Sequence, residues 1–310
     1  MKLAFVYAGQ GSQHIGMGKD FYDQYPAFRA TFALAEKDLA KLCFESTEEE
    51  LAITANTQPA MVAFAVGVTD LLYEAGIKPL MAAGLSLGEY SALYAAGVFA
   101  KKTVIDLADY RGKVMQECLT KPCEMQAILG LERETLREIV KEASVYGLVE
   151  IANYNCPGQL AIAGEEKSVQ MAGKLALERG AKRAVKLKVS GPFHTSMMKP
   201  AGDLLREKFE TVDFQPLNIP VIFNTTAKPL EMGKSIAQML ELQVQSSVYF
   251  EDSIRYMIEQ GIDTIVEIGP GKVLSGFIKR IDKSIKTYVV EDVASLEKVI
   301  DELKGAHDGE

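Results

Sequence analysis

The sequence has few of the residues that build disulfide frameworks and metal sites. Its 310 residues include four cysteines and three histidines, and no two cysteines have the C-x-x-C spacing of a redox or zinc motif. We therefore expect the cysteines to be buried or partly buried thiols of a protein in the reducing cytoplasm, with no metal bound. A disulfide-stabilised secreted domain and a zinc-bound domain are both disfavoured.

Long apolar segments are also missing. No stretch approaches the roughly 18 uninterrupted apolar residues of a membrane-spanning helix, so we expect no membrane span. The apolar start, residues 3–7, has no small-residue cleavage site and leads into a glycine-rich turn, which predicts a strand rather than a signal peptide. Excess positive charge is absent as well: the formal net charge is −8, which argues against nucleic acid as a partner.

What the sequence does contain is an alternation of short apolar segments with longer helical patterns. This alternation favours a parallel sheet with helices on both faces. We predict strands at residues 3–7, 79–85, 221–224, 264–268 and 287–290. We predict helices at residues 26–42, 58–75, 89–96, 101–119, 198–209, 236–242 and 252–260, and a disordered tail at 305–310.

The middle of the chain has a different pattern. We predict strands at residues 125–129, 149–153, 159–163 and 183–189, helices at 132–143 and 167–179, and a turn at 155–158. The order β-α-β-β-α-β is the ferredoxin-like arrangement. The predicted fold class is therefore α/β, with a hydrolase-like parallel-sheet main domain (residues 1–123 and 191–310). A ferredoxin-like subdomain (residues 124–190) is inserted into it.

The best candidate for a nucleophile is Ser86. It lies in Gly84-Leu85-Ser86-Leu87-Gly88, a G-x-S-x-G motif between a predicted strand and a predicted helix. Such a tight turn needs small flanking residues, lifts the hydroxyl above the sheet edge and points the Leu87 amide at developing negative charge. A structural serine in a turn is the alternative, because the motif by itself is common.

A serine hydroxyl needs a base, and the chain offers three histidines. His307 lies in the polar tail and His14 in the first glycine-rich loop. His194 follows the predicted inserted subdomain, at a junction between domains, where ligand sites usually form. We therefore predict His194 as the base, downstream of the nucleophile as in hydrolase-type folds. The alternative is a histidine that only bonds the linker between the domains.

One arginine falls on the apolar face of a predicted helix. Arg111 continues the row formed by Val104, Leu107, Val114 and Cys118 at helical spacing. A guanidinium on an inward face needs an anionic partner, because an unpaired buried charge is costly. Its planar fork matches a carboxylate through two parallel hydrogen bonds. Arg111 is thus predicted to bind an acidic substrate group, or else to form an internal ion pair.

Several motifs occur in a characteristic order along the chain. They are Gly9-Gln10-Gly11-Ser12-Gln13, Gly84-Leu85-Ser86-Leu87-Gly88-Glu89-Tyr90, Tyr110-Arg111-Gly112, Asn153-Tyr154-Asn155 with Pro157-Gly158-Gln159, Gly191-Pro192-Phe193-His194, Gln243 and Glu267-Ile268-Gly269-Pro270-Gly271. In these motifs, over roughly residues 1–300, the sequence resembles the malonyl-CoA:acyl-carrier-protein transacylases.

The resemblance implies a division of roles among the motif residues. Ser86 would carry the acyl group as an ester, and His194 would act first as general base and then as general acid. Gln10 and the Leu87 amide would form the oxyanion hole. The family uses no acidic third member, and the resemblance places the carbonyl that orients the histidine at Gln243. A carbonyl can fix the tautomer of the imidazole without adding a buried charge.

The resemblance also implies how the acyl group is recognised. Arg111 would hold the free carboxylate of malonyl, and Asn153 and Leu85 are further expected substrate contacts. Phe193 resembles the malonyl-selecting form of related polyketide acyltransferases, because a bulky ring leaves little room for a 2-methyl branch. Two residues depart from the family pattern. Leu85 replaces the usual histidine, which removes a polar contact near the pocket and can alter selectivity or hydrolysis, and Ala8 replaces the usual proline.

The implied activity is ping-pong transfer of malonyl from malonyl-CoA to the phosphopantetheine thiol of acyl carrier protein, for fatty-acid synthesis. No cofactor is needed, and the resemblance implies a monomer. Two basic groups are candidates for docking an acidic carrier, with solvated lysines as the alternative. One group comprises Lys182, Arg183, Lys186 and Lys188, and the other Lys279, Arg280, Lys283 and Lys286.

Three other functions remain open at this stage. A serine acyl hydrolase would use the same Ser86 and His194 with water as the acceptor. A stand-alone loader of a polyketide synthase would share every residue discussed, and only its carrier would differ. A silent acyl-binding module would be expected to have lost Ser86 or His194, and the sequence retains both.

Overall fold

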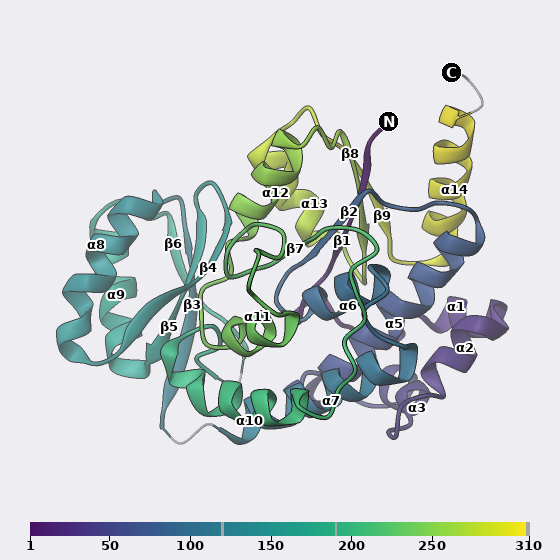
Figure 1. Cartoon of the computed structure of the whole chain (residues 1–310). Coiled ribbons are helices and arrows are strands. Elements are labelled where there is room, and N and C mark those ends of the chain that lie inside the picture. The colour runs from purple at the N-terminus through teal and green to yellow at the C-terminus, as the bar shows by residue number, and fades with distance from the viewer. Residues whose placement is uncertain (119–120, 190, 308–310) are drawn as a thin grey trace.

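A five-stranded sheet lies at the centre of the larger part of the molecule (Figure 1). The computed structural model describes residues 1–118, 121–189 and 191–307. The sheet has the order β7-β2-β1-β8-β9, and all of these strands are parallel. The strands are β1 (Leu3–Tyr7), β2 (Met81–Gly84), β7 (Val221–Ile222), β8 (Thr264–Ile268) and β9 (Lys286–Val290).

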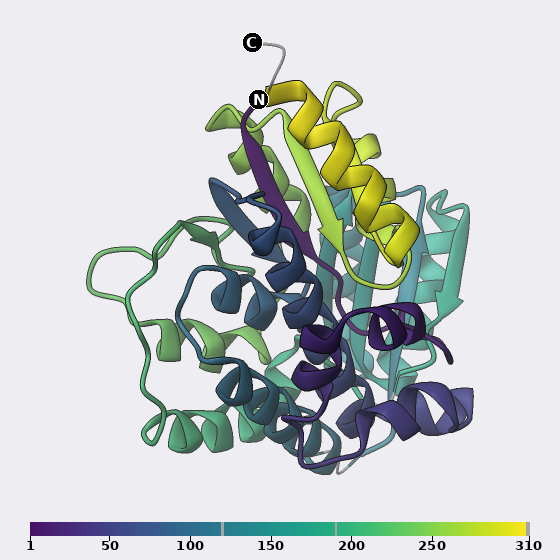
Figure 2. The same cartoon turned by 90° about the vertical axis from the view of Figure 1, so that its right-hand side faces the viewer.

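Helices cover both faces of this sheet, so its strands are apolar on both sides. On β1, Phe5 and Tyr7 belong to the core cluster that includes α5 and α14, whereas Ala4 and Val6 belong to the cluster with α12 and α13. Figure 2 shows α14 lying beside the sheet. The helices are α1 (Lys19–Gln24), α2 (Pro26–Phe32), α3 (Leu39–Phe44), α4 (Glu48–Leu51), α5 (Thr54–Glu74), α6 (Gly88–Ala95), α7 (Lys101–Glu117), α10 (Lys199–Phe209), α11 (Ile236–Gln243), α12 (Phe250–Glu259), α13 (Val273–Ile281) and α14 (Val293–His307).

The second sheet is antiparallel and has four strands in the order β4-β5-β3-β6. The helices α8 and α9 pack on it around a separate apolar core. In chain order the elements are β3 (Cys123–Leu129), α8 (Arg133–Ala143), β4 (Val149–Cys156), β5 (Gln159–Glu165), α9 (Glu166–Glu178) and β6 (Arg183–Lys186), with a 3-10 turn at Ser144–Tyr146. This is the ferredoxin-like topology, and the predicted fold class is confirmed.

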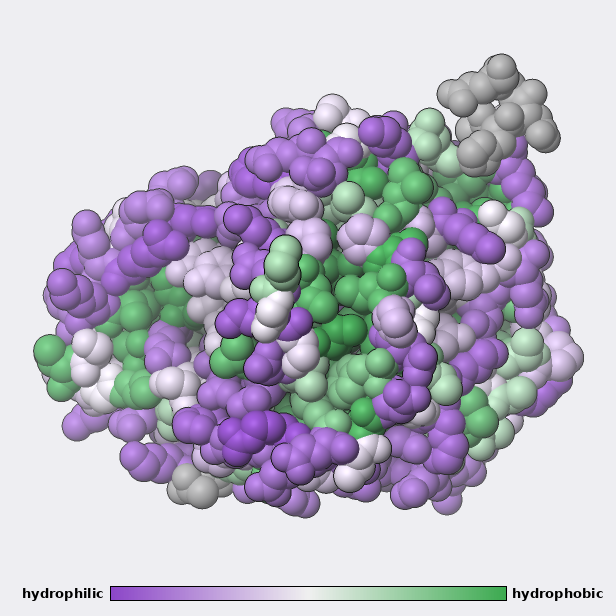
Figure 3. All heavy atoms as spheres, viewed as in Figure 1, coloured by the Kyte–Doolittle hydropathy of each residue, from purple (hydrophilic) through white to green (hydrophobic). Residues whose placement is uncertain are grey.

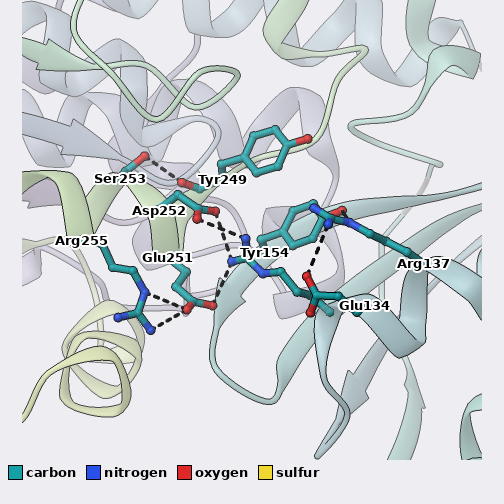
Figure 4. A network of polar contacts seen from close by, with 9 residues as sticks. Glu134, Arg137, Tyr154, Tyr249, Glu251, Asp252, Ser253 and Arg255 are labelled. Atoms are coloured by element: carbon teal, nitrogen blue, oxygen red, sulfur yellow. Dashed lines mark hydrogen bonds and ion pairs between the residues drawn. The ribbon is translucent and has the colours of Figure 1, made fainter.

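Polar and aromatic contacts join the small sheet to the main sheet's helices (Figure 4). Arg133 at the start of α8 forms ion pairs with Glu251 and Asp252 at the start of α12, at 3.2 and 3.1 Å. The rings of Tyr154 and Tyr249 stack, with centroids 4.9 Å apart. The backbone also pairs at this junction, because the Tyr154 amide donates to the Val248 carbonyl and the Val248 amide to the Ala152 carbonyl. The segment before α12 therefore extends the small sheet beyond β4.

Some element boundaries differ from the prediction. The helix predicted at residues 26–42 is two helices, because the Asp38 side chain caps a new start by accepting the Lys41 amide. The strand predicted at 221–224 ends at Ile222, and the turn predicted at 155–158 contains only Pro157 and Gly158.

The tail expected to be disordered from residue 305 is instead helical as far as His307 in α14, and residues 308–310 lie outside the described part.

The surface, the helices and the cysteines have the properties expected from the sequence. Hydrophilic side chains cover most of the face shown in Figure 3, and apolar side chains show mainly near its middle. Within the described residues, every helix is too short or too polar to cross a bilayer. The four cysteines are buried or half-buried, as expected from the sequence.

Candidate active site

The turn between β2 and α6 holds Ser86 in a strained backbone conformation. Its φ of 54° lies in the left-handed region, which costs a non-glycine residue on the order of 1–3 kcal/mol. The flanking glycines are needed for space, because a Cβ at Gly84 would lie 1.9 Å from the Gly88 carbonyl carbon. A Cβ at Gly88 would lie 2.2 Å from the Tyr7 carbonyl oxygen. This is the geometry of a nucleophile elbow, in which strand and helix pack too closely for any side chain.

His194 contacts the serine directly. Its Nε2 lies 2.7 Å from Ser86 Oγ, although the two residues are 108 positions apart in the chain. Its Nδ1 lies 2.8 Å from the backbone carbonyl oxygen of Gln243. A carbonyl can only accept, so Nδ1 carries the proton and the unprotonated Nε2 accepts from the Ser86 hydroxyl. This tautomer is the one that a general base requires.

The surroundings of His194 keep its imidazole neutral. Burial and, to a smaller extent, the positive charge of Arg111 together lower the pKa of His194 from its usual 6.5 to about 4, against the opposing effect of the Gln243 carbonyl. The ring is 3% exposed. The unprotonated Nε2 of His194 can therefore accept a proton at neutral pH.

Arg111 lies beside the serine and is fully buried, as its apolar row predicted. Its Nη2 donates to Ser86 Oγ at 3.2 Å and to Gln243 Oε1 at 2.9 Å, and its Nη1 donates to Gln58 Oε1 at 2.9 Å. These three partners are neutral, and Arg111 Nε has no hydrogen-bond partner within the described residues. A buried cation held by neutral groups next to a nucleophile suits an anionic substrate group better than an internal ion pair.

Four more of the predicted residues line one cavity together with Ser86, His194 and Arg111. Its volume is about 200 Å³, and it lies between the two sheets. Gln10, Leu85, Asn153 and Phe193 all contribute to its wall. Gln243 does not line it, but its carbonyl holds His194 as described. Leu87 immediately precedes α6, so its amide belongs to the positive end of that helix.

Gln10 has an additional contact that the sequence does not suggest. Its Nε2 donates to Thr54 Oγ1 at 3.1 Å, at the start of α5. Apolar side chains of α13, Val273 and Phe277, also line the cavity. The cavity thus combines one cation, a few amide groups and apolar walls, as is typical of pockets for small polar acyl groups.

Three buried polar residues around the site were not identified from the sequence. Asn224 Oδ1 accepts from the Ser86 amide at 2.7 Å, Glu89 Oε2 accepts from the Asn224 amide at 2.6 Å, and Gln58 holds Arg111. Burial raises the pKa of Glu89 to about 8, which the Asn224 amide and the Arg111 charge oppose. The sequence pointed only to Glu89, which belongs to the motif that contains Ser86. Asn224 and Gln58 reach the site from distant segments, so no local motif includes them.

Comparisons with known proteins agree with this site. Residues 4–308 match the acyl transferase domain family. A malonyl CoA-acyl carrier protein transacylase of Bacillus subtilis is 44% identical over 99% of both chains. The crystal structure of such a transacylase from Clostridium perfringens superposes with a TM-score of 0.95 at 39% identity, covering 99% of this chain and 98% of that one.

A further solved structure contains a carrier. It is a malonyl-transacylase in complex with a type II polyketide acyl-carrier protein, with a TM-score of 0.94 at 39% identity, covering 97% of this chain and all of that one. Together with the serine elbow, its histidine and the full-length matches, these likenesses confirm the predicted resemblance. The chain belongs to the acyl transferase family, with malonyl-CoA:acyl-carrier-protein transacylases as its relatives.

Proposed function

We propose that this protein transfers malonyl from malonyl-CoA to the phosphopantetheine thiol of acyl carrier protein, for fatty-acid synthesis. The observation that carries the proposal is the set of contacts around Ser86. Its hydroxyl lies 2.7 Å from an unprotonated imidazole nitrogen and 3.2 Å from a buried guanidinium. The first contact supplies a base and the second a partner for the malonyl carboxylate.

In the first half-reaction, Ser86 Oγ attacks the thioester carbonyl carbon while His194 Nε2 takes the hydroxyl proton. We expect the Leu87 amide and Gln10 to stabilise the oxyanion of the tetrahedral intermediate. The intermediate collapses by breaking the carbon–sulfur bond, and His194 returns the proton to the departing CoA sulfur. Malonyl remains as an ester on Ser86, with its free carboxylate paired to Arg111.

The second half-reaction runs the same steps in reverse with a new thiol. The carrier's phosphopantetheine thiol gives its proton to His194 and attacks the ester carbonyl, and Ser86 Oγ leaves and recovers the proton. Water must be kept out, because it would release malonate from the ester. The apolar wall formed by Leu85, Phe193 and the α13 side chains Val273 and Phe277 supports this exclusion.

The inserted segment gives the cavity its second wall. We propose residues 124–190 as a subdomain distinct from residues 1–123 and 191–310, because it has its own sheet and apolar core. Asn153 on β4 reaches the cavity from this side, where we expect it to contact the acyl or pantetheine part of the donor. We also infer a cytoplasmic location and a monomer, in keeping with the CoA substrate and the single-chain site.

The carrier requires a positive docking surface near the cavity mouth, and α13 is the better of the two predicted basic groups. Lys279, Arg280 and Lys283 are exposed on or just after the helix whose Val273 and Phe277 line the cavity. On β6, by contrast, Lys186 pairs with Glu124 at 2.8 Å and lies near Glu166, which partly neutralises that group. In the α13 group, Lys286 pairs with Glu302.

The proposal is tested by supplying malonyl-CoA with and without phosphopantetheinylated carrier. We expect malonyl-carrier to form stoichiometrically, measured by mass spectrometry, and little free malonate in its absence. Rapid malonate release with or without carrier would instead identify a hydrolase. Comparing fatty-acid and polyketide carriers in the same assay distinguishes the two transferase roles. The polyketide carrier is included because a similar malonyl-transacylase has been solved in complex with one.

A further inference from the structure

The backbone of Ser86 is held from both sides by side-chain amides. Its N–H donates to Asn224 Oδ1 at 2.7 Å, and its carbonyl accepts from Gln243 Nε2 at 2.8 Å. Asn224 is 1% exposed and Gln243 fully buried. Peptide groups of a tight turn usually bond to other backbone groups or to water. Here the Ser86 carbonyl does accept the Glu89 amide at 3.0 Å, but two side chains from distant segments additionally fix the strained peptide units.

Asn224 bridges the elbow rather than touching one atom of it. While Oδ1 accepts the Ser86 amide, its Nδ2 donates to the Gly84 carbonyl at 2.7 Å. The position of Asn224 is itself fixed, because its backbone N–H donates at 2.6 Å to Oε2 of Glu89, the second residue of the helix that follows Ser86. Asn224 thereby links the end of β2, the elbow and the start of α6. It lies two residues after the end of β7, in the part of the predicted strand that is not a strand in the structure.

These contacts have a consequence for the oxyanion. The Ser86 amide already donates to Asn224, so it is not free to stabilise the developing charge, and that role falls to the next amide, at Leu87. The direction of Ser86 Oγ toward His194 depends on the same backbone conformation. Asn224 is not among the described residues that line the cavity. Its effect on the reaction must therefore be exerted through Ser86.

We propose that Asn224 is a positioning residue for acyl transfer: together with the Gln243 side chain, it holds the left-handed Ser86 backbone so that Oγ faces His194 and the Leu87 amide faces the oxyanion. This inference rests on the proposed function for the identity of the acyl donor, but not for the reactivity of Ser86. A displacement of about 1 Å at a reacting group can cost about 100-fold in rate.

Two substitutions separate positioning from a merely structural role. Asn224→Ala removes both bridging bonds. Asn224→Asp keeps the acceptor for the Ser86 amide, but when ionised it turns an oxygen lone pair toward the Gly84 carbonyl. A protonated aspartic acid has the donor and acceptor pattern of asparagine. Activity of Asn224→Asp should therefore recover as pH falls, whereas that of Asn224→Ala should not.

The measurement is the rate at which a fluorophosphonate probe labels Ser86, followed by intact mass, beside kcat and KM for malonyl-CoA. The probe needs only the elbow and His194, so it reports on positioning even if the acyl donor is another thioester. The control is Ser168→Ala, which removes a buried hydroxyl bonded to the Leu148 carbonyl at 2.7 Å, at the start of α9 on the small sheet. Melting temperatures are recorded for all variants.

We expect Asn224→Ala to label at least about 10-fold more slowly, with kcat falling equally and KM within about threefold of the parent. Ser168→Ala should label at the parent rate. Parent-like labelling and kcat in folded Asn224→Ala would overturn the proposal. So would a loss explained entirely by a smaller folded fraction. If Asn224→Ala does not fold, the pH series of Asn224→Asp decides: recovery toward low pH supports positioning, and a profile parallel to the parent's refutes it.

Discussion

At the scale of single residues, the site depends on how charge is arranged around one neutral imidazole. His194 is buried, and a backbone carbonyl sets its tautomer. The cation beside it is Arg111, whose hydrogen-bond partners are neutral. A malonyl carboxylate bound to Arg111 would offset that cation. Under the proposed function, the bound malonyl group would thus also make His194 a stronger base.

The pH dependence of labelling follows from the lowered pKa of His194. Only the neutral ring accepts the Ser86 proton, so activity is lost as pH falls through the folded-state pKa, which is about 4. We expect the rate of fluorophosphonate labelling to be flat from about pH 8 down to about pH 5 and half-maximal near pH 4. In Arg111→Gln the midpoint should move to higher pH, because a charge that lowers the pKa is gone. A parent midpoint at or above 6.5 would contradict this account.

The size of the cavity wall at Phe193 predicts a change in selectivity. The ring is 6% exposed and lines the cavity beside His194. In Phe193→Ala we expect the ratio of kcat/KM for methylmalonyl-CoA over malonyl-CoA to rise by about 10-fold, since discrimination of one methyl group is worth about 10- to 200-fold. Competition assays with both thioesters measure it. An unchanged ratio would show that another wall excludes the methyl branch.

At the scale of elements, the elbow is the contact between β2, β1 and α6. Its residues were predicted from the sequence because a G-x-S-x-G motif between a strand and a helix is a local pattern. Arg111 was likewise placed inward by the spacing of its helix. Asn224 and Gln58 could not be found this way. Each lies in an ordinary apolar or helical segment, and only the packing of β7 and α5 brings them to the site.

The close packing of the elbow predicts the effect of a single methyl group. Gly84→Ala places a Cβ 1.9 Å from backbone atoms that cannot move without shifting α6, so we expect it to lower the free energy of unfolding by about 3 kcal/mol or more. Gly276→Ala is the control, because its Cβ meets nothing within 4 Å inside α13. It should raise stability by about 0.5–1 kcal/mol. Urea denaturation compares them, and equal effects would refute the steric explanation.

At the scale of the whole molecule, the cavity lies where two independent sheets meet. The sequence predicted both sheets, because β-α-β-β-α-β interrupts a pattern of parallel strands. It did not predict how they are joined. The Arg133 ion pairs, the Tyr154–Tyr249 stack and the strand-like pairing of Val248 depend on residues about 100 positions apart, for which no sequence spacing gives a signal.

The exposed charge on α13 predicts a defect confined to the second half-reaction. Lys279→Glu combined with Lys283→Glu should slow malonyl transfer to carrier about 10-fold at low salt and leave acylation by malonyl-CoA within twofold. Arg280 is left intact because it donates to Gln159, which lines the cavity. Lys141→Glu with Lys174→Glu, on α8 and α9, is the matched control. Equal slowing of both half-reactions, or of the control, would exclude α13 as the docking surface.

The most direct test of the central claim is the intact mass of the protein after incubation with malonyl-CoA alone, with Ser86→Ala and Arg111→Ala measured in parallel. We expect one malonyl adduct on the parent protein and none on Ser86→Ala. Acetyl-CoA should give an adduct only when Arg111 is replaced. An adduct that survives Ser86→Ala, or equal acetylation of the parent protein, would contradict the roles assigned to these two residues.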